Sequence, residues 1–178
     1  MKTIATDVLP YLRGYPADTV GQIATMLDAG KVGPWLLQKY PHGHGLRTDR
    51  ALFDHVQGLK QEFLKGADAV GKVAYDSKLQ VVKNALGTHT TVSRVQGSKL
   101  KAKREIRIAS MFKDAPPEFL NMIVVHELAH LRERDHDKAF YQLCTYMEPG
   151  YHQLEFEVRV YLTHLERSGE RLWAQQSA

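Results

Sequence analysis

The stretch from Asn121 to Asp137 constrains the fold of this chain more than any other. It places the pattern His-Glu-x-x-His at residues 126–130, inside a nearly continuous run of apolar side chains. On an α-helix, His126 and His130 project from one face, one turn apart, and this spacing lets two imidazoles bind a single Zn²⁺ ion. Glu127 can reach a water molecule activated by the metal and act as its general base. The pattern predicts a metal-dependent hydrolase.

The surrounding residues predict that this helix is buried. Hardly any polar side chain interrupts residues 119–129 apart from the motif itself, and a helix that is apolar all round belongs in a protein core. We expect Asp114 to cap the start of the helix, with two prolines in the first turn, and the helix to end near Arg134. Burying histidines in such surroundings is costly unless their ring nitrogens are occupied, and a metal ion would occupy them.

A third histidine follows the motif and is our first choice for a third metal ligand. His136 lies six residues after His130, and a set of three leaves one position open for water, as a catalytic zinc site requires. The chain must turn back to bring His136 to the metal. Metzincins make that turn with a glycine, whereas this chain has Glu133 there. Glu148 and Glu155 are the alternative third ligands. Imidazole ligands favour Zn²⁺, although Mn²⁺, Co²⁺ or Ni²⁺ can occupy such a site.

These residues resemble the YgjP-like family of zinc metallohydrolases, small intracellular relatives of the SprT and WLM proteases. The similarity is strongest at residues 115–131, at His136 and at residues 138–140, and it extends to residues 92–97 and 148–156. Many relatives carry Trp-Gly-Ser-Cys ahead of the strand that precedes the helix, where this chain has Arg-Val-Gln-Gly at 94–97. The resemblance implies that His126, His130 and His136 bind the metal and that Glu127 is the catalytic acid and base.

The resemblance leaves the substrate open between two kinds of bond. The family is called a peptidase family because of its motif, and a pyrophosphatase activity on UTP has also been attributed to it. We expect peptide bonds first, because phosphoanhydride cleavage usually recruits Mg²⁺ on carboxylates and the sequence has no evident acidic cluster. UTP pyrophosphatase is the alternative. A zinc-stabilised binding protein without turnover is the second alternative, and the intact Glu127 argues against it.

Length and composition place the chain among ordinary globular proteins. Its 178 residues predict one domain. No apolar run reaches the length of a membrane span, and the first residues do not resemble a signal peptide, so we expect a cytoplasmic protein. The lone Cys144 should be a buried apolar side chain rather than a nucleophile. A net charge of +4 permits an anionic substrate without requiring one.

The expected fold class is α+β, with a zincin-like core in which a small twisted sheet packs on the His-Glu-x-x-His helix. Residues 1–70 should form an N-terminal helical layer, and residues 71–178 the zinc-binding core. Apolar spacing and turn residues predict helices at 6–12, 17–28, 35–40, 49–64, 138–147 and 151–165, the fourth capped by Thr48 or Asp49. Alternation predicts a hairpin over residues 73–82 and strands at 90–95 and 100–108. The polar tail after Arg167 should fray.

A basic row on the last predicted strand has two interpretations. A solvated face that blocks unwanted strand pairing is the simpler one, and a phosphate-contacting surface is the other. Too few aromatic residues accompany the charges to indicate single-stranded nucleic acid binding. The residues concerned are Lys99, Lys101, Lys103 and Arg107, with Arg94 and Arg104 as the better phosphate candidates.

Several other side chains have a functional and a structural interpretation. Tyr151 or His152 could hydrogen-bond the oxyanion formed during hydrolysis, but packing and helix capping are the favoured roles. Met147 could lie beneath the metal, and core packing explains it equally well. His42 and His44 alternate with glycines in a loop, so we do not expect a metal site there.

Overall fold

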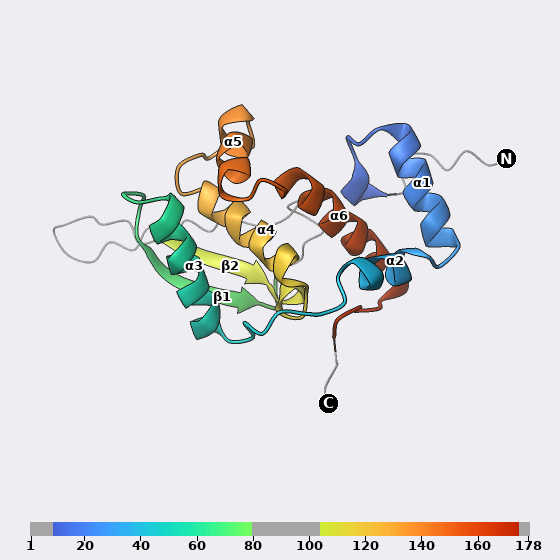
Figure 1. The fold of residues 1–178 in the computed structure, drawn as a ribbon, viewed down its shortest axis with the longest axis horizontal. Coiled ribbons are helices and arrows are strands. Elements are labelled where there is room, and N and C mark those ends of the chain that lie inside the picture. The colour runs from blue at the N-terminus through green and yellow to red at the C-terminus, as the bar shows by residue number, and fades with distance from the viewer. Residues whose placement is uncertain (1–8, 80–103, 175–178) are drawn as a thin grey trace.

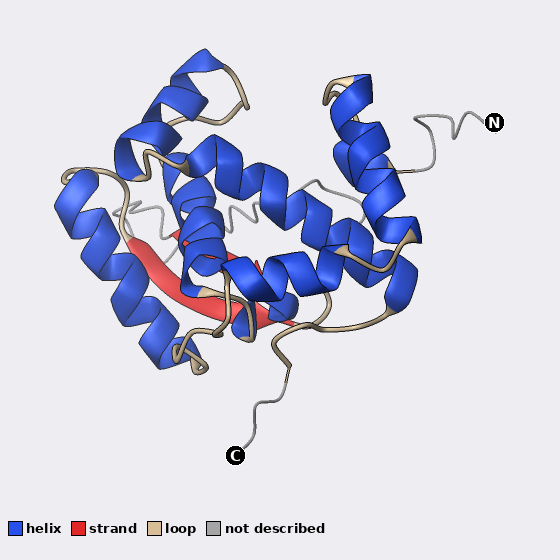
Figure 2. Ribbon diagram, turned by 45° about the vertical axis from the view of Figure 1, so that its right-hand side comes forward, coloured by secondary structure: helices blue, strands red, loops and turns tan. Residues whose placement is uncertain are grey.

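The structure, a computed structural model, describes residues 9–79 and 104–174 and has the expected α+β class (Figures 1 and 2). Within these residues, no helix has both the length and the apolar composition needed to cross a membrane. In chain order, the elements are η2 (Pro10–Leu12), α1 (Ala17–Asp28), α2 (Val32–Lys39), α3 (Asp49–Phe63), β1 (Val70–Asp76), β2 (Arg104–Ala109), η3 (Ser110–Lys113), α4 (Pro117–Ala129), α5 (Lys138–Met147) and α6 (Tyr151–Ser168).

Among the N-terminal helices, α1 and α3 follow local signals in the sequence closely, whereas α2 begins at Val32, ahead of the predicted start at Trp35. α1 has the predicted bounds, and Gly30 follows it with a φ of +65°, a conformation that few residues other than glycine adopt. Thr48 caps α3, because its hydroxyl oxygen accepts the Ala51 N–H at 3.1 Å. The helix expected over residues 6–12 is a single 3₁₀ turn, η2, in the part of it that the structure describes.

The two described strands pair in parallel. Val73 lies opposite Ile106, and Tyr75 lies opposite Ile108. The inward positions Val73, Ile106 and Ile108 are all buried. The described strand that pairs with β1 is therefore β2. Parallel strands cannot be joined by a tight turn and require a long connection. The second half of the predicted hairpin (residues 80–82) and the strand at 90–95 lie outside the described residues.

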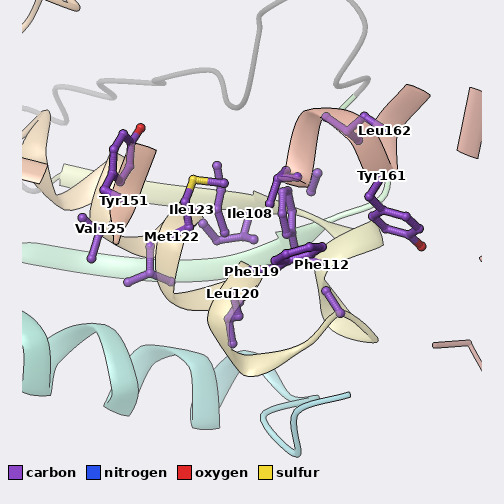
Figure 3. Packing of buried hydrophobic residues seen from close by; sticks show 14 of the residues in the cluster. Ile108, Phe112, Phe119, Leu120, Met122, Ile123, Val125, Tyr151, Tyr161 and Leu162 are labelled. Atoms are coloured by element: carbon purple, nitrogen blue, oxygen red, sulfur yellow. The ribbon is translucent and has the colours of Figure 1, made fainter. Parts of the chain in front are cut away.

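Helix α4 lies at the centre of the molecule (Figure 1). It contacts β2 and α3 on one side, and α5 and α6 on the other, while α3 also covers β1. α6 crosses α4 and holds α2 and η2 against the rest of the chain. Ten of the thirteen residues of α4 are buried, which explains why its sequence is apolar on every side. Figure 3 shows Phe119, Met122 and Ile123 of this helix packed beside Ile108 of β2.

The start of α4 differs from the prediction. Pro116 is the N-cap, and no side chain caps the helix. The expected cap, Asp114, instead pairs with Arg47 and Arg171 and is almost buried. The Asp114 carboxylate therefore links the loop before α3, through Arg47, and the segment after α6, through Arg171, to the residues that precede α4. The sequence could not show this role, because both arginines lie far from Asp114 along the chain.

The segment after α6 was expected to fray, and this prediction was wrong for the residues up to 174. Trp173 is buried, and its indole N–H donates to the Tyr40 carbonyl at 2.7 Å. Its ring packs edge-on against Phe119 and close to Tyr161. The Trp173 ring and the ion pair of Arg171 with Asp114 together hold this polar segment against the core.

Candidate metal centre

Three histidine side chains converge at the C-terminal end of α4. The Nε2 atom of His130 lies 3.3 Å from Nε2 of His126 and 2.9 Å from Nε2 of His136. One ligand atom from each of the three lies within 4.8 Å of those of the other two. His126 and His130 are buried, whereas His136 is exposed and arrives from the turn after the helix. The structure therefore brings together the three residues predicted from sequence.

The chain turns back earlier than expected. α4 ends at Ala129, and His130 is its C-cap residue, with a backbone still near the helical region. The amides of Arg132 and Glu133 both bond the Ala129 carbonyl, at 3.1 and 3.0 Å, and this tight turn starts the reversal. The chain makes this turn without a glycine, since residues 130–136 contain none.

Hydrogen bonds at Nδ1 orient the two buried rings. Nδ1 of His126 lies 2.8 Å from the Tyr151 hydroxyl, and Nδ1 of His130 lies 2.8 Å from the Glu133 carbonyl. A carbonyl only accepts, so His130 carries its proton on Nδ1 and its Nε2 has a lone pair directed at the other two histidines. Partners of this kind fix the tautomer and the ring direction of metal-binding histidines.

The donor set and its spacing fit a metal ion. A tetrahedral zinc ion with Zn–N bonds of about 2.0–2.1 Å separates its ligand nitrogens by roughly 3.3 Å. The Nε2 separations of 2.9 and 3.3 Å at His130 are close to that value. Without a cation, several imidazole lone pairs at this distance would repel one another in a buried site. His126, His130 and His136 could thus hold a divalent metal that accepts nitrogen ligands.

Glu127 lies next to His126 on α4 and is only 4% exposed. A buried carboxylate is costly to keep in an apolar helix, and groups of this kind cluster at functional sites. Its place beside the histidine cluster suits a group that exchanges a proton with a substrate at the metal.

The aromatic ring of Phe140 forms the apolar floor of the cluster. Its centroid lies 5.0 Å from that of His126, 4.5 Å from that of His130 and 4.8 Å from that of His136, and Phe140 is fully buried. Met147 was the sequence-based candidate for this place. Met147 is buried in the core, and the aromatic ring that packs against all three histidines is that of Phe140. The sequence identified Phe140 only as an inward residue of α5.

The two glutamates considered as alternative ligands have other partners. Glu148 accepts hydrogen bonds from the Asn121 amide at 2.7 Å and from the Gly150 N–H at 3.0 Å. Glu155 is paired with Arg159 at 3.0 Å. Neither belongs to the group of potential ligand atoms found among the described residues.

Tyr151 and His152 occupy different environments. Tyr151 is fully buried and bonded to His126. Burial raises the pKa of its hydroxyl most, and the Glu155 carboxylate raises it further. His152 is exposed, and the N-cap of α6 is Gly150, so His152 does not cap the helix. The Tyr151 hydroxyl, which was a candidate for a hydrogen bond to the oxyanion, thus orients the His126 ring.

The described part of the basic row is paired with acidic side chains. Arg104 pairs with Asp68, and Arg107 pairs with both Asp76 and Glu105. Paired arginines on a sheet surface match the solvated-face interpretation better than a phosphate site. Lys99, Lys101, Lys103 and Arg94 lie outside the described residues.

His44 and Cys144 have structural environments. Nε2 of His44 lies 2.7 Å from the Phe112 carbonyl, and Nδ1 accepts the Leu46 N–H at 2.9 Å. Both ring nitrogens are used, and burial lowers the pKa of His44. Cys144 is fully buried, and burial raises the pKa of its thiol to about 12. Such a thiol remains protonated at neutral pH and is a poor nucleophile.

Comparison with known proteins adds to this geometry. The family model described as YgjP-like, metallopeptidase domain, matches residues 72–159, which include most of β1, all of β2, α4 and α5, and the three histidines. The chain is also 56% identical, over 157 residues, to the protein named UTP pyrophosphatase of Escherichia coli (strain K12). That alignment covers 88% of this chain and 94% of the relative. No solved structure matches the chain significantly.

Proposed function

This chain belongs to the YgjP-like family, and from that premise we propose that it is a nucleoside-triphosphate pyrophosphatase whose metal is held by His126, His130 and His136. The proposed substrate class is inferred from the 56% identity to a UTP pyrophosphatase over 94% of that protein's length. At this identity and coverage, the relative and this chain share the whole fold and not only the motif. The sequence alone favoured peptide bonds, and the relative moves phosphoanhydrides to first place.

The metal, when bound, supplies a Lewis acid that polarises a phosphoryl oxygen and lowers the pKa of a water molecule. The chain supplies the rest of the site. His126 and His130, buried and oriented through Nδ1, hold their Nε2 atoms in place, and the exposed His136 completes the set from the turn after α4. Zinc is the ion that best suits three imidazole donors.

Glu127 is the proposed general base and acid. Its carboxylate takes a proton from the attacking water and gives one to the leaving group. For a triphosphate, water adds to a phosphorus atom as the P–O bond to the oxygen that bridges the α- and β-phosphates breaks, and the products are a nucleoside monophosphate and pyrophosphate. The apolar floor at Phe140 and the burial of Glu127 keep bulk water away from this carboxylate and strengthen electrostatic interactions.

Peptide-bond hydrolysis is the second candidate function. The His-Glu-x-x-His helix favours it, because this arrangement is the one used by zinc proteases, and the matching family model carries the name metallopeptidase. The same residues would act in the same roles on a carbonyl carbon. A cytoplasmic location stays a prediction of the sequence.

A paired assay distinguishes these functions. Wild type and Glu127→Gln, each analysed for metal content, are given UTP, the other nucleoside triphosphates and unfolded polypeptides. We expect pyrophosphate release from UTP that falls by about 10²–10⁴-fold in the variant, the usual contribution of a general base, with metal content unchanged. Peptide cleavage that is lost in Glu127→Gln, without triphosphate cleavage, would establish the second function. Inactivity on every substrate by metal-loaded wild type would indicate a binding protein.

A further inference from the structure

The side chain that supports His126 is fully buried and shares a face of α6 with a buried carboxylate. Tyr151 opens α6, and Figure 3 shows its ring at one end of the buried cluster. Its hydroxyl lies 2.8 Å from Nδ1 of His126, and the whole residue is inaccessible to solvent. For His126 to bind a metal through Nε2, Nδ1 must carry the proton, so the Tyr151 oxygen is the acceptor in this bond.

The Tyr151 hydroxyl then has its own proton to donate. Glu155 lies one turn further along the same face of α6 and is 7% exposed, and its negative charge raises the pKa of the Tyr151 hydroxyl. A negative charge at this place attracts the hydroxyl proton and leaves the oxygen lone pairs for His126.

Arg159 fixes the position of Glu155. Its Nη2 and Nε atoms donate to the same carboxylate oxygen at 3.0 and 3.2 Å, and its Nη1 donates to the Tyr11 carbonyl at 3.1 Å. The Tyr11 carbonyl belongs to η2, in the N-terminal part that the family model does not cover. Arg159 therefore joins Glu155 to the N-terminal segment.

We propose that Tyr151 and Glu155 are positioning residues for the metal. Glu155 orients the Tyr151 hydroxyl, and that hydroxyl accepts the Nδ1 proton of His126 and holds Nε2 toward His130 and His136. This inference rests on the proposed role of His126 as a ligand. The bond from His126 to the Tyr151 hydroxyl takes the place of the carbonyl or carboxylate bond that orients most metal-binding histidines.

A purely structural role for Tyr151 makes a different prediction. Filling space and satisfying a buried Nδ1 would affect the stability of the metal-free protein, but not its preference for a metal. A positioning role affects the metal affinity itself, because a rotated or re-protonated ring no longer presents the Nε2 lone pair. Zinc affinity, measured beside the melting temperature of the metal-free protein, therefore separates the two roles.

The test compares Tyr151→Phe with Tyr161→Phe by competitive titration of Zn²⁺ against a chromophoric chelator. Both tyrosines are buried on α6, and Tyr161 packs on Phe119 and Trp173, at the other end of the cluster (Figure 3). Each variant loses one buried hydroxyl. We expect Tyr151→Phe to bind zinc about 10–100-fold more weakly than wild type, as for other partners of metal ligands. Tyr161→Phe should stay within about threefold of wild type, since it does not contact the ligands.

Glu155→Gln is a second variant, for the case that Tyr151→Phe does not fold. Because it removes the charge but keeps the shape, we expect zinc binding about tenfold weaker than that of wild type. If the folded variants bind zinc as tightly as Tyr161→Phe does, the positioning role is refuted, while the proposed metal site stands. If wild type itself binds no zinc, the metal site of the proposed function fails and this inference fails with it.

Discussion

Replacing His136 with alanine tests the ligand set at its most accessible member. His136 is exposed and lies in the turn after α4, whereas His126 and His130 are buried in the helix. Removing an exposed side chain from a turn usually changes the free energy of unfolding by less than about 0.5 kcal/mol. The metal-free protein should therefore keep its fold and its melting temperature, so that any loss of metal affinity reports on the ligand itself.

The size of the affinity loss follows from the binding energy per ligand. Structural zinc sites with four protein ligands bind with about 10–16 kcal/mol, or roughly 2.5–4 kcal/mol for each ligand. Since 1.4 kcal/mol is a factor of ten, losing one ligand should weaken binding about 10²–10³-fold. In excess zinc, this reduces the stabilisation of the folded state by about 2.7–4.1 kcal/mol. For a chain of this size, that corresponds to roughly 5–16 °C in melting temperature.

Differential scanning calorimetry with and without zinc, together with chelator competition, measures both quantities. Asp135→Ala is the matched control, because Asp135 is an exposed residue of the same turn and is not in the histidine cluster. Zinc should raise the melting temperature of Asp135→Ala as much as that of wild type. The reasoning is refuted if His136→Ala retains wild-type affinity, and the ligand set is wrong if Glu148→Ala loses zinc instead.

Three further results are expected. Phe140→Ala removes a fully buried ring and should lower the free energy of unfolding by about 3–5 kcal/mol. The melting temperature measured by calorimetry should then fall by roughly 6–20 °C. A loss of less than about 1 kcal/mol would contradict the close packing of Phe140 under the histidines. A Cβ on Gly43 would lie 2.5 Å from the Asp114 carbonyl oxygen, whereas one on Gly45 meets nothing within 4 Å. Urea unfolding should therefore show a loss of about 1–3 kcal/mol for Gly43→Ala and less than about 0.5 for Gly45→Ala. Burial lowers the pKa of His44, so the unfolded chain binds this proton more readily and stability falls as the pH drops below the ordinary histidine value. Urea titrations of the metal-free proteins at several pH values should show that acid lowers the free energy of unfolding less for His44→Gln than for wild type. The same pH dependence in both proteins would refute this prediction.

The sequence by itself determined the elements that depend on neighbours along the chain. The all-apolar helix with its two histidines, the Thr48 cap, the glycine after α1 and the bounds of α5 follow from spacing, capping and turn chemistry. These signals act within a turn or two of backbone, so they are readable without the fold. The histidine pattern also predicted the chemistry, because the two proposed ligands and the proposed base lie within about one helical turn.

The tertiary structure decided every feature that joins distant segments. The parallel pairing of β1 with β2, the binding of Asp114 by two arginines and the docking of Trp173 all connect residues far apart in the chain. The support of His126 is of the same kind, because Tyr151 lies 25 residues from it and reaches it only through the crossing of α4 and α6. Which side chains meet across such a crossing depends on how the helices pack, and periodicity shows only that a residue points inward.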